Sequence, residues 1–339
     1  MTRRRLRLGL LLGLLATTAL VLSSNGAAQK EDFTMAFVTD IGSLQDKSFN
    51  QLGNEGRIRV GKELGIKTRV YETRKAEDRL PNLLAAATAG YDVIVANGFF
   101  HAEGLNTVAP RFPRQRFVGI DVGIGLLPST PRNYTGITFA EHEAGYLVGY
   151  LAALTAQRQG GKQVISAVGA NPVPAIVKYI SGYIQGAKKA NPKIKVIANY
   201  ANDPTFTNQA KCKTVALRQI AQGSQVVFQV AGGCGVGALN AAKEKKVWGI
   251  GVDADQAYFG PHMLTSATKF VDVAVVVMTK RAYLDRLQGG VDFLFNVKNG
   301  KVGLGKVSPK VPAADLAKVN RVKKQIANGQ IKVKPTIKF

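Results

Sequence analysis

The feature that most constrains the fold of this chain is a strand–helix plan that occurs twice, at an offset of about 130 residues. The expected strands are 33–39, 67–71, 92–96 and 116–120 in the first copy, and 163–169, 195–200, 225–230 and 247–252 in the second. The expected helices are 49–64, 79–89 and 103–111, then 175–190, 209–221 and 238–246. This alternation predicts parallel sheets covered by helices on both faces. The ordered repeat favours two similar lobes over one long doubly wound domain.

The expected strand ends carry polar residues and glycines of the kind that line ligand sites. They are Thr39-Asp40, Ala96-Asn97-Gly98, Asp121, Gly169-Ala170-Asn171, Ala231-Gly232-Gly233 and Asp253. In doubly wound sheets, ligands bind beyond the carboxyl ends of the strands. Carboxylates and amides supply hydrogen-bonding groups, and glycines let the backbone approach a ligand closely. Two facing sets of such ends predict a cleft; the alternative is that the aspartates cap helices or occupy solvated turns.

The first 28 residues have the order of features found in a secretory signal peptide. Arginines stand within 3–7, an apolar run covers Leu8 to Leu22, and small residues lead to Ala28. The run is shorter than the roughly 20 residues that span a bilayer, which favours cleavage after Ala28 over a retained membrane anchor. The segment has no cysteine, so it lacks the usual bacterial lipid-attachment point. We expect export to the periplasm or to the outer face of the cell membrane.

The formal net charge of +24 raises the question of an anionic partner. Nucleic acid is one such partner. The basic residues, however, are spread along the chain rather than gathered in an arm or on one helix, and an exported protein rarely meets nucleic acid. We therefore expect no nucleic-acid partner, and weak attraction to an anionic cell surface is the alternative.

The chain has two cysteines, Cys212 and Cys234. Outside the cytoplasm such a pair can form a disulfide, and the alternative is two buried thiols. Neither cysteine has a histidine neighbour, and His101, His142 and His262 lie in separate segments without metal-ligand spacing. We expect no metal site and no cofactor.

Several short motifs stand in order along the chain after the apolar N-terminal segment. They are Asp40-Ile-Gly-Ser-Leu-Gln-Asp46-Lys-Ser48-Phe49-Asn50-Gln51, Phe117-Val-Gly-Ile-Asp121, Glu143-Ala-Gly-Tyr146-Leu-Val-Gly149, Ala231-Gly232-Gly233-Cys-Gly235, Gly251-Val-Asp253-Ala-Asp255-Gln256 and Thr265-Ser266-Ala-Thr-Lys269. Together they resemble the basic membrane protein family. Its members are substrate-binding proteins of ABC transporters and include purine-nucleoside receptors.

This resemblance implies a type 1 periplasmic-binding-protein fold, in which two doubly wound lobes are joined by a three-segment hinge. On the family's pattern, lobe 1 would comprise 33–136 and 266–288, and lobe 2 would comprise 137–265 and 289–339. The repeat alone does not predict this exchange of segments. The resemblance also implies a non-catalytic protein that closes around a small ligand and presents it to ABC transporter permease subunits, through which it would associate peripherally with the membrane.

The resemblance further assigns ligand-binding roles to Asp40, Phe49, Asn50, Asp121, Phe206, Gly232, Gly233, Asp253 and Lys269. Phe49 and Phe206 would stack on the two faces of a purine. Asn50 and Asp121 would read the edges of the base, and Asp253 would bind the ribose hydroxyls. The remaining positions would supply further polar or backbone contacts. From the residues alone, the favoured interpretation is that Phe49 begins a helix and packs in the core.

Two other functions remain as alternatives at this point. A nucleoside-processing enzyme would need clustered carboxylates, and the spacing of Asp40 and Asp46 is only a weak sign of them. The segment from Gly233 to Gly237 lacks the full spacing of a dinucleotide-binding fingerprint. A binding protein that feeds a signalling receptor would use the same cleft as a transport protein. We therefore expect no catalytic residue, and a binding protein for transport or sensing.

Overall fold

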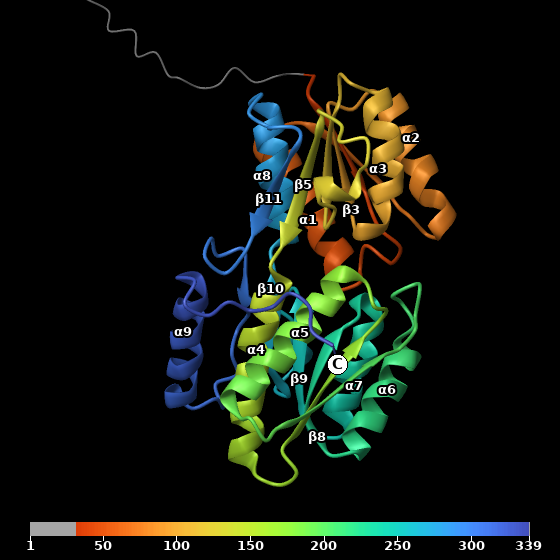
Figure 1. Ribbon diagram of the computed structural model, residues 1–339. Helices are drawn as coiled ribbons and strands as arrows, with labels where there is room; N and C mark the ends of the chain where they lie inside the picture. The colour runs from red at the N-terminus through yellow and green to blue at the C-terminus, as the bar shows by residue number, and fades with distance from the viewer. Residues whose placement is uncertain (1–31, 339) are drawn as a thin grey trace, which may run out of the picture. The chain divides into compact units, whose positions relative to one another are not determined.

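Within the computed structural model, which describes residues 32–338, the chain forms two six-stranded sheets with helices packed against them (Figure 1). The signal peptide expected at residues 1–28 lies outside this range. No helix between residues 32 and 338 combines the length and the apolar character needed to cross a bilayer. The paired sheets confirm the α/β architecture expected from the repeat.

The first sheet is parallel throughout and has the strand order β11-β5-β4-β3-β1-β2. In chain order its strands are β1 (Thr34–Val38), β2 (Lys67–Tyr71), β3 (Val93–Asn97), β4 (Arg116–Ile120), β5 (Tyr134–Phe139) and β11 (Val291–Phe295). Its helices are α1 (Phe49–Leu64), α2 (Arg79–Thr88), α3 (Ala102–Val108) and α8 (Val271–Tyr283). The central strands are buried on both faces, which explains their continuous apolar runs.

The second sheet has the order β12-β10-β9-β8-β6-β7 and is parallel except for β12, which pairs antiparallel with β10. Its strands are β6 (Val164–Gly169), β7 (Lys195–Tyr200), β8 (Ser224–Val230), β9 (Trp248–Asp253), β10 (Met263–Lys269) and β12 (Val302–Leu304). Its helices are α4 (Glu141–Gln159), α5 (Pro174–Ala190), α6 (Gln209–Ala221), α7 (Gly235–Glu244) and α9 (Ala313–Ala327).

The chain passes between the sheets three times, after β5, after β10 and after β11. We define lobe 1 as 32–139 with 270–295, and lobe 2 as 140–269 with 296–338. The boundaries 136/137 and 265/266 that the family pattern implies fall inside β5 and β10. The third, 288/289, precedes β11, which pairs with β5 in the first sheet. We therefore propose boundaries at the ends of these three strands.

Helix α1, which carries several of the expected site residues, has a well-defined start and end. Asp46 accepts hydrogen bonds from the backbone amides of Ser48, Asn50 and Gln51 at 2.9–3.1 Å, and so satisfies amides that have no partner within the helix. At the other end Gly65 adopts a left-handed conformation with φ of 66°, a common helix stop. These two signals fix the position of Phe49 in the first turn.

Helices α4 and α5 pack with their backbones unusually close, because glycines face each other across the contact. Gly145 and Gly149 lie against the backbone of Tyr179 and Tyr183 in α5. The reciprocal glycines of α5, Gly182 and Gly186, lie against the backbone of His142 and Tyr146 in α4. A methyl group at any of these glycines would overlap the partner helix. The motif Glu143-Ala-Gly-Tyr146-Leu-Val-Gly149 thus has a packing role that places α5 beside the hinge.

Candidate functional site

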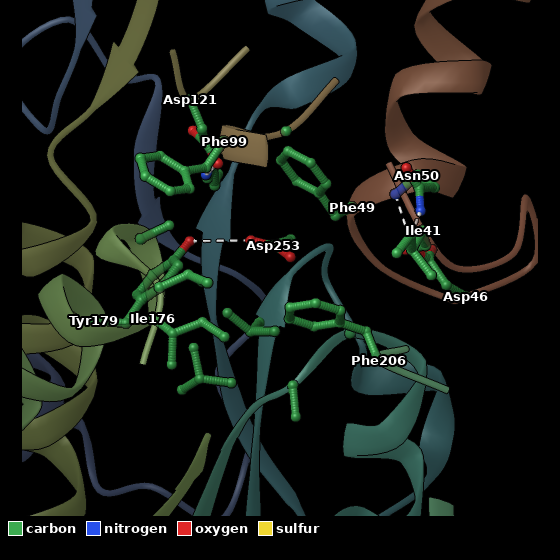
Figure 2. A pocket seen from close by; sticks show the side chains of 18 of the residues that line it. Ile41, Asp46, Phe49, Asn50, Phe99, Asp121, Ile176, Tyr179, Phe206 and Asp253 are labelled. Carbon is green, nitrogen blue, oxygen red and sulfur yellow. Dashed lines mark hydrogen bonds and ion pairs between the residues drawn. The ribbon is translucent and has the colours of Figure 1, made fainter. Parts of the chain in front are cut away.

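A cavity lies between the two lobes, where the carboxyl ends of strands from both sheets meet (Figure 2). Its volume is about 100 Å³. Lobe 1 contributes Ile41, Asp46, Phe49, Asn50, Gly98, Phe99, Phe100 and Asp121, and lobe 2 contributes Val173, Ala175, Ile176, Tyr179, Phe206, Val230, Ala231, Gly232, Val252, Asp253 and Lys269. The lining combines aromatic rings, aliphatic side chains and a few charged groups, which is typical of small-molecule sites.

Most of the expected site residues line this cavity, and two do not. Those that line it are Phe49, Asn50, Asp121, Phe206, Gly232, Asp253 and Lys269. Asp40 instead accepts two hydrogen bonds from the Arg79 guanidinium, at 2.9 and 3.0 Å, and one from the amide of Ile41. Gly233 lies beside Asp46 in a separate recess at the edge of the cleft.

Phe49 and Phe206 enter the cavity from opposite lobes, with Asp253 between them in the view of Figure 2. Phe206 lies in the loop between β7 and α6 and has a left-handed backbone, with φ of 57°. This conformation is held from two sides. Its amide donates to the Asp203 carbonyl at 3.3 Å, and its carbonyl accepts from the amide of Cys234 at 2.8 Å. The loop therefore presents the ring from a fixed backbone.

Asp121 and Asp253 occupy equivalent strand ends in the two lobes, and both have left-handed backbones, with φ of 64° and 60°. Asp253 accepts hydrogen bonds from Ser48 Oγ at 2.6 Å and from the Tyr179 hydroxyl at 3.3 Å. Since Ser48 belongs to lobe 1, its hydrogen bond joins the lobes. Burial raises the pKa of Asp253 above its ordinary value, because an ionised carboxylate is poorly solvated there.

Asp121 has one oxygen engaged and one free. Its Oδ2 accepts from Lys269 Nζ at 2.5 Å, whereas the buried Oδ1 has no hydrogen-bond partner among the described residues. Burial raises the pKa of Asp121 to about 6 against the opposing effect of Lys269. The free oxygen is a hydrogen-bond acceptor at the cavity wall, available to a ligand donor.

Lys269 is buried at the end of β10, where the chain passes from lobe 2 to lobe 1. Besides Asp121, its ammonium donates to Glu141 Oε1 at 3.0 Å and lies 5.0 Å from the centre of the Phe49 ring. Burial disfavours the charged form, but Asp121, Glu141 and Asp253 outweigh it and hold the pKa of Lys269 above its ordinary value. The lysine is therefore a fixed positive charge beside the cavity.

Asn50 lines the cavity, but its side chain is used within lobe 1. Its Oδ1 accepts from the Asp40 amide at 3.2 Å and from Asn97 Nδ2 at 3.2 Å. Its Nδ2 donates to the carbonyls of Asp40 and Ile41. With 2% of its surface exposed, Asn50 joins the loop after β1 to the end of β3.

Several cavity residues were not expected from the sequence. Asp46 lines the wall while it caps α1, and burial raises its pKa to about 6 although backbone amides donate to it. Phe99 and Phe100 follow the end of β3, so the rule that indicated Asn97 and Gly98 could have found them. Tyr179 had no such signal, because it lies inside a buried helical face.

Cys212 and Cys234 form a disulfide that joins α6 to the turn before α7, with Cα atoms 5.6 Å apart. The amide of Cys234 is the donor that holds the carbonyl of Phe206. The disulfide thus anchors the loop that carries an aromatic wall of the cavity. Between residues 32 and 338 no cluster of histidine, cysteine or acidic side chains has the arrangement of a metal site.

Comparison with known proteins identifies a family that covers nearly all of the described residues. Residues 33–336 match the family model described as "ABC transporter substrate-binding protein PnrA-like". The chain is 32% identical over 333 residues to the ABC transporter nucleoside-binding protein BmpA of Lactococcus lactis, with 92% of each chain covered. It is 30% identical over 314 residues to basic membrane protein A of Borreliella burgdorferi, covering 91% of this chain and 90% of the relative.

Solved structures of solute-binding proteins have the same fold. A solute-binding protein of an ABC transporter system from Aeropyrum pernix aligns with a TM-score of 0.81 and 26% identity, covering 88% of this chain and 92% of that one. A second, from Conexibacter woesei, aligns with a TM-score of 0.72 and 22% identity, covering 90% of this chain and 100% of that one. The latter supports the fold alone.

Proposed function

Because the chain belongs to the family of PnrA-like ABC transporter substrate-binding proteins, we propose that it binds a purine nucleoside between its lobes and delivers it to the permease of an ABC transporter. The family binds solutes outside the cytoplasm and is not a family of enzymes. Two aromatic rings that enter one cavity from opposite lobes, with a buried carboxylate beside them, are the observation that carries the choice of ligand. A relative named for nucleoside binding supports the same choice.

The two rings match the flat, apolar faces of a purine. Stacking of a base on an aromatic side chain contributes about 1–3 kcal/mol and works with any base, because every base has a π face. Phe49 and Phe206 would hold the base from the two lobes. Phe99 and Phe100 would extend the aromatic wall on the side of lobe 1.

The polar groups of the cavity match the edges of a nucleoside. Asp121 Oδ1 would accept a hydrogen bond from a ring N–H or an exocyclic amine. Asp253 has the acceptors to bind two adjacent ribose hydroxyls. Lys269 would keep Asp121 ionised, so that Asp121 can accept the hydrogen bond from the base. Gly232, with φ of 56° and Phe206 as its neighbour, would offer backbone groups.

The three other expected residues would act indirectly under this proposal. Asn50 would hold the loop after β1 in place through its four hydrogen bonds. Asp40 would do the same through Arg79. Gly233 would keep the recess beside Asp46 open.

The size of the cavity implies that ligand exchange requires movement of the lobes. Small-molecule pockets usually measure about 300–1,000 Å³, and this cavity measures about 100 Å³. The structure therefore corresponds to a nearly closed cleft. Rotation about the three connecting segments would open it, as in other hinged binding proteins, and the permease would then recognise the closed, loaded form.

A thermal-shift panel tests the ligand class directly. Protein stripped of carried-over ligand by denaturation and refolding is heated with nucleosides, free bases, sugars and amino acids. A ligand that binds only the folded state at 100 times its Kd stabilises the protein by about 2.7 kcal/mol and raises Tm. We expect the largest increase with purine nucleosides and little with sugars or amino acids. No increase with any nucleoside would reject the proposed ligand.

A further inference from the structure

The two lobes differ sharply in charge, although the basic residues are spread along the sequence. Lobe 1 carries 16 Lys and Arg against 14 Asp and Glu, whereas lobe 2 carries 25 against 7. Most of the difference comes from the last segment, 296–338, which returns to lobe 2 and contains 11 basic residues and one acidic residue. Basic residues that are spread along the sequence are therefore concentrated on one lobe by the fold.

A second, solvent-open recess of about 440 Å³ lies on the surface of this basic lobe, and the lysines that line it are exposed. Its wall includes Gln159, Lys243, Lys246, Trp248, His262 and Lys310. Trp248 is the first residue of β9, and His262 immediately precedes β10. The ligand cleft lies at the other end of the same strands. The two sites are thus separated by the length of these strands and share no lining residue.

The three lysines of this cavity have no carboxylate partner in residues 32–338, and no acidic residue lines the cavity. The acidic neighbour on α7, Glu244, is already paired with Lys213 at 2.9 Å and Lys245 at 3.4 Å. Like charges that share a recess repel each other, and an anion placed among them removes that repulsion.

The position of the lysines has only a partial structural explanation. Lys243 and Lys246 stand at the C-terminal end of α7, where positive side chains interact favourably with the helix dipole. This does not explain Lys310, which comes from the loop between β12 and α9 and lies 5.8 Å from the centre of the Trp248 ring. Two separate segments therefore bring positive charge to one recess.

We propose that this recess, the lysine pocket, binds a phosphate-bearing anion. The three ammonium groups would neutralise the phosphate, and the Gln159 amide would add a neutral hydrogen-bond donor. The excess positive charge of lobe 2 would draw such an anion toward the pocket. The phosphate can come from a soluble compound or from the headgroup of an anionic phospholipid, and these two sources share the same recognition chemistry.

His262 provides a local readout for occupancy. Burial, and then the charge of Lys243, lower the pKa of His262 below its ordinary value. A bound phosphate would supply the opposite charge, so the pKa of His262 should rise by on the order of 1 unit. NMR titration of the ring protons with inorganic phosphate measures this shift. His101 and His142, the other two histidines, lie elsewhere in the fold and serve as internal controls.

A second experiment, after the NMR titration, uses vesicles and two variants that lose the same number of positive charges. The pocket variant combines Lys243→Gln, Lys246→Gln and Lys310→Gln. The control variant combines Lys189→Gln, Lys193→Gln and Lys195→Gln, which removes the same charge from exposed positions of lobe 2. Binding is measured to vesicles of phosphatidylglycerol and of phosphatidylcholine. If the lipid is the source, the pocket variant should lose on the order of 100-fold in affinity for phosphatidylglycerol vesicles, and the control variant much less.

Each outcome decides between these sources or rejects the pocket. A His262 shift with inorganic phosphate, with equal vesicle binding by the two variants, identifies a soluble phosphate compound. Selective loss of vesicle binding by the pocket variant identifies the lipid headgroup. No His262 shift, together with equal losses in both variants, overturns the proposal and assigns any vesicle binding to the overall charge of lobe 2. Nucleoside binding by the pocket variant should be unchanged, so this test is independent of the proposed ligand.

Discussion

Phe49 is the residue whose replacement most directly tests nucleoside stacking. Its ring lines the cavity and lies near the Lys269 ammonium. Because base stacking contributes about 1–3 kcal/mol, Phe49→Ala should weaken binding of a purine nucleoside by about tenfold or more in calorimetric titration. Phe49→Leu keeps most of the apolar volume, so its thermal stability should be closer to that of the wild type than that of Phe49→Ala, whereas its affinity should stay weak. Unchanged affinity in Phe49→Ala would show that the ring only packs against the protein.

The carboxyl group of Asp121 should make nucleoside binding depend on pH. Burial raises its pKa to about 6, so the carboxylate that accepts from the ligand is lost as the pH falls through 6. Affinity should be about tenfold weaker at pH 5 than at pH 7, because about one tenth of the Asp121 carboxyl groups remain ionised one pH unit below the pKa. Asp46 has a similar pKa, so the Asp121→Asn variant is needed to assign the effect. That variant should bind weakly at both pH values, and an unchanged pH profile would move the assignment to another group.

The sign of the pH effect on stability separates this loss of binding from unfolding. A carboxyl group whose folded pKa is raised takes up a proton in the folded state between about pH 6 and pH 4, where the unfolded chain is still ionised. Its contribution to the free energy of unfolding therefore increases as the pH falls through that window. Asp121 by itself would make the protein more stable at pH 5 while it binds its ligand less well.

The residue scale also shows where sequence reasoning stops. Strand-end aspartates were predictable, because their position follows from the sheet alone. The role of Asn50 was not predictable, because its side chain makes four hydrogen bonds to groups at the ends of β1 and β3, three with the backbone and one with the Asn97 side chain. An amide can bind a ligand or a loop, and only three-dimensional neighbours decide which. The same holds for the choice of Asp46 rather than Asp40 as a cavity residue.

At the scale of elements, the disulfide between α6 and the turn before α7 should support both stability and binding. It closes a segment of 22 residues, for which the chain-entropy model gives about 3 kcal/mol. The free energy of unfolding of the Cys212→Ala, Cys234→Ala double variant should therefore be lower by that amount, and urea denaturation measures this as a lower midpoint concentration. Because the disulfide anchors the turn whose Cys234 amide donates to the Phe206 carbonyl, nucleoside affinity should fall as well. If stability fell and affinity did not, the Phe206 loop would be fixed by Asp203 alone.

The strands and helices of the repeat were well predicted, because each has a continuous apolar run or a clear stop such as Gly65. All the expected strands and helices are present, with α3 continuing as a turn of 3₁₀ helix over Ala109–Arg111. The elements beyond the repeat, including β5, β11 and α8, were not placed by it. They belong to segments that cross between lobes, and local patterns do not encode which sheet a strand joins.

At the scale of the whole molecule, the exchange of segments produces properties that neither half of the sequence has. The chain crosses three times between the sheets, so lobe 2 receives 296–338 and with it most of the excess positive charge. Lys269 lies immediately before one crossing and Glu141 just after another. Lys269 Nζ and Glu141 Oε1 are in direct contact at 3.0 Å. The buried ion pairs and the ligand cleft are consequently parts of one hinge region.

Closure of the lobes should depend on the hydrogen bond from Ser48 in lobe 1 to Asp253 in lobe 2, at 2.6 Å. Removal of one such hydrogen bond costs about 0.5–1.5 kcal/mol, so Ser48→Ala should weaken nucleoside binding by about three- to tenfold, mainly through faster dissociation. Ser43→Ala is the matched control, since Ser43 bonds only within its own loop. Small-angle X-ray scattering adds the structural readout: the wild-type radius of gyration should fall when nucleoside is added. Ser48→Ala should need more ligand for the same change, and an equal radius with and without ligand would rule out closure as the binding mechanism.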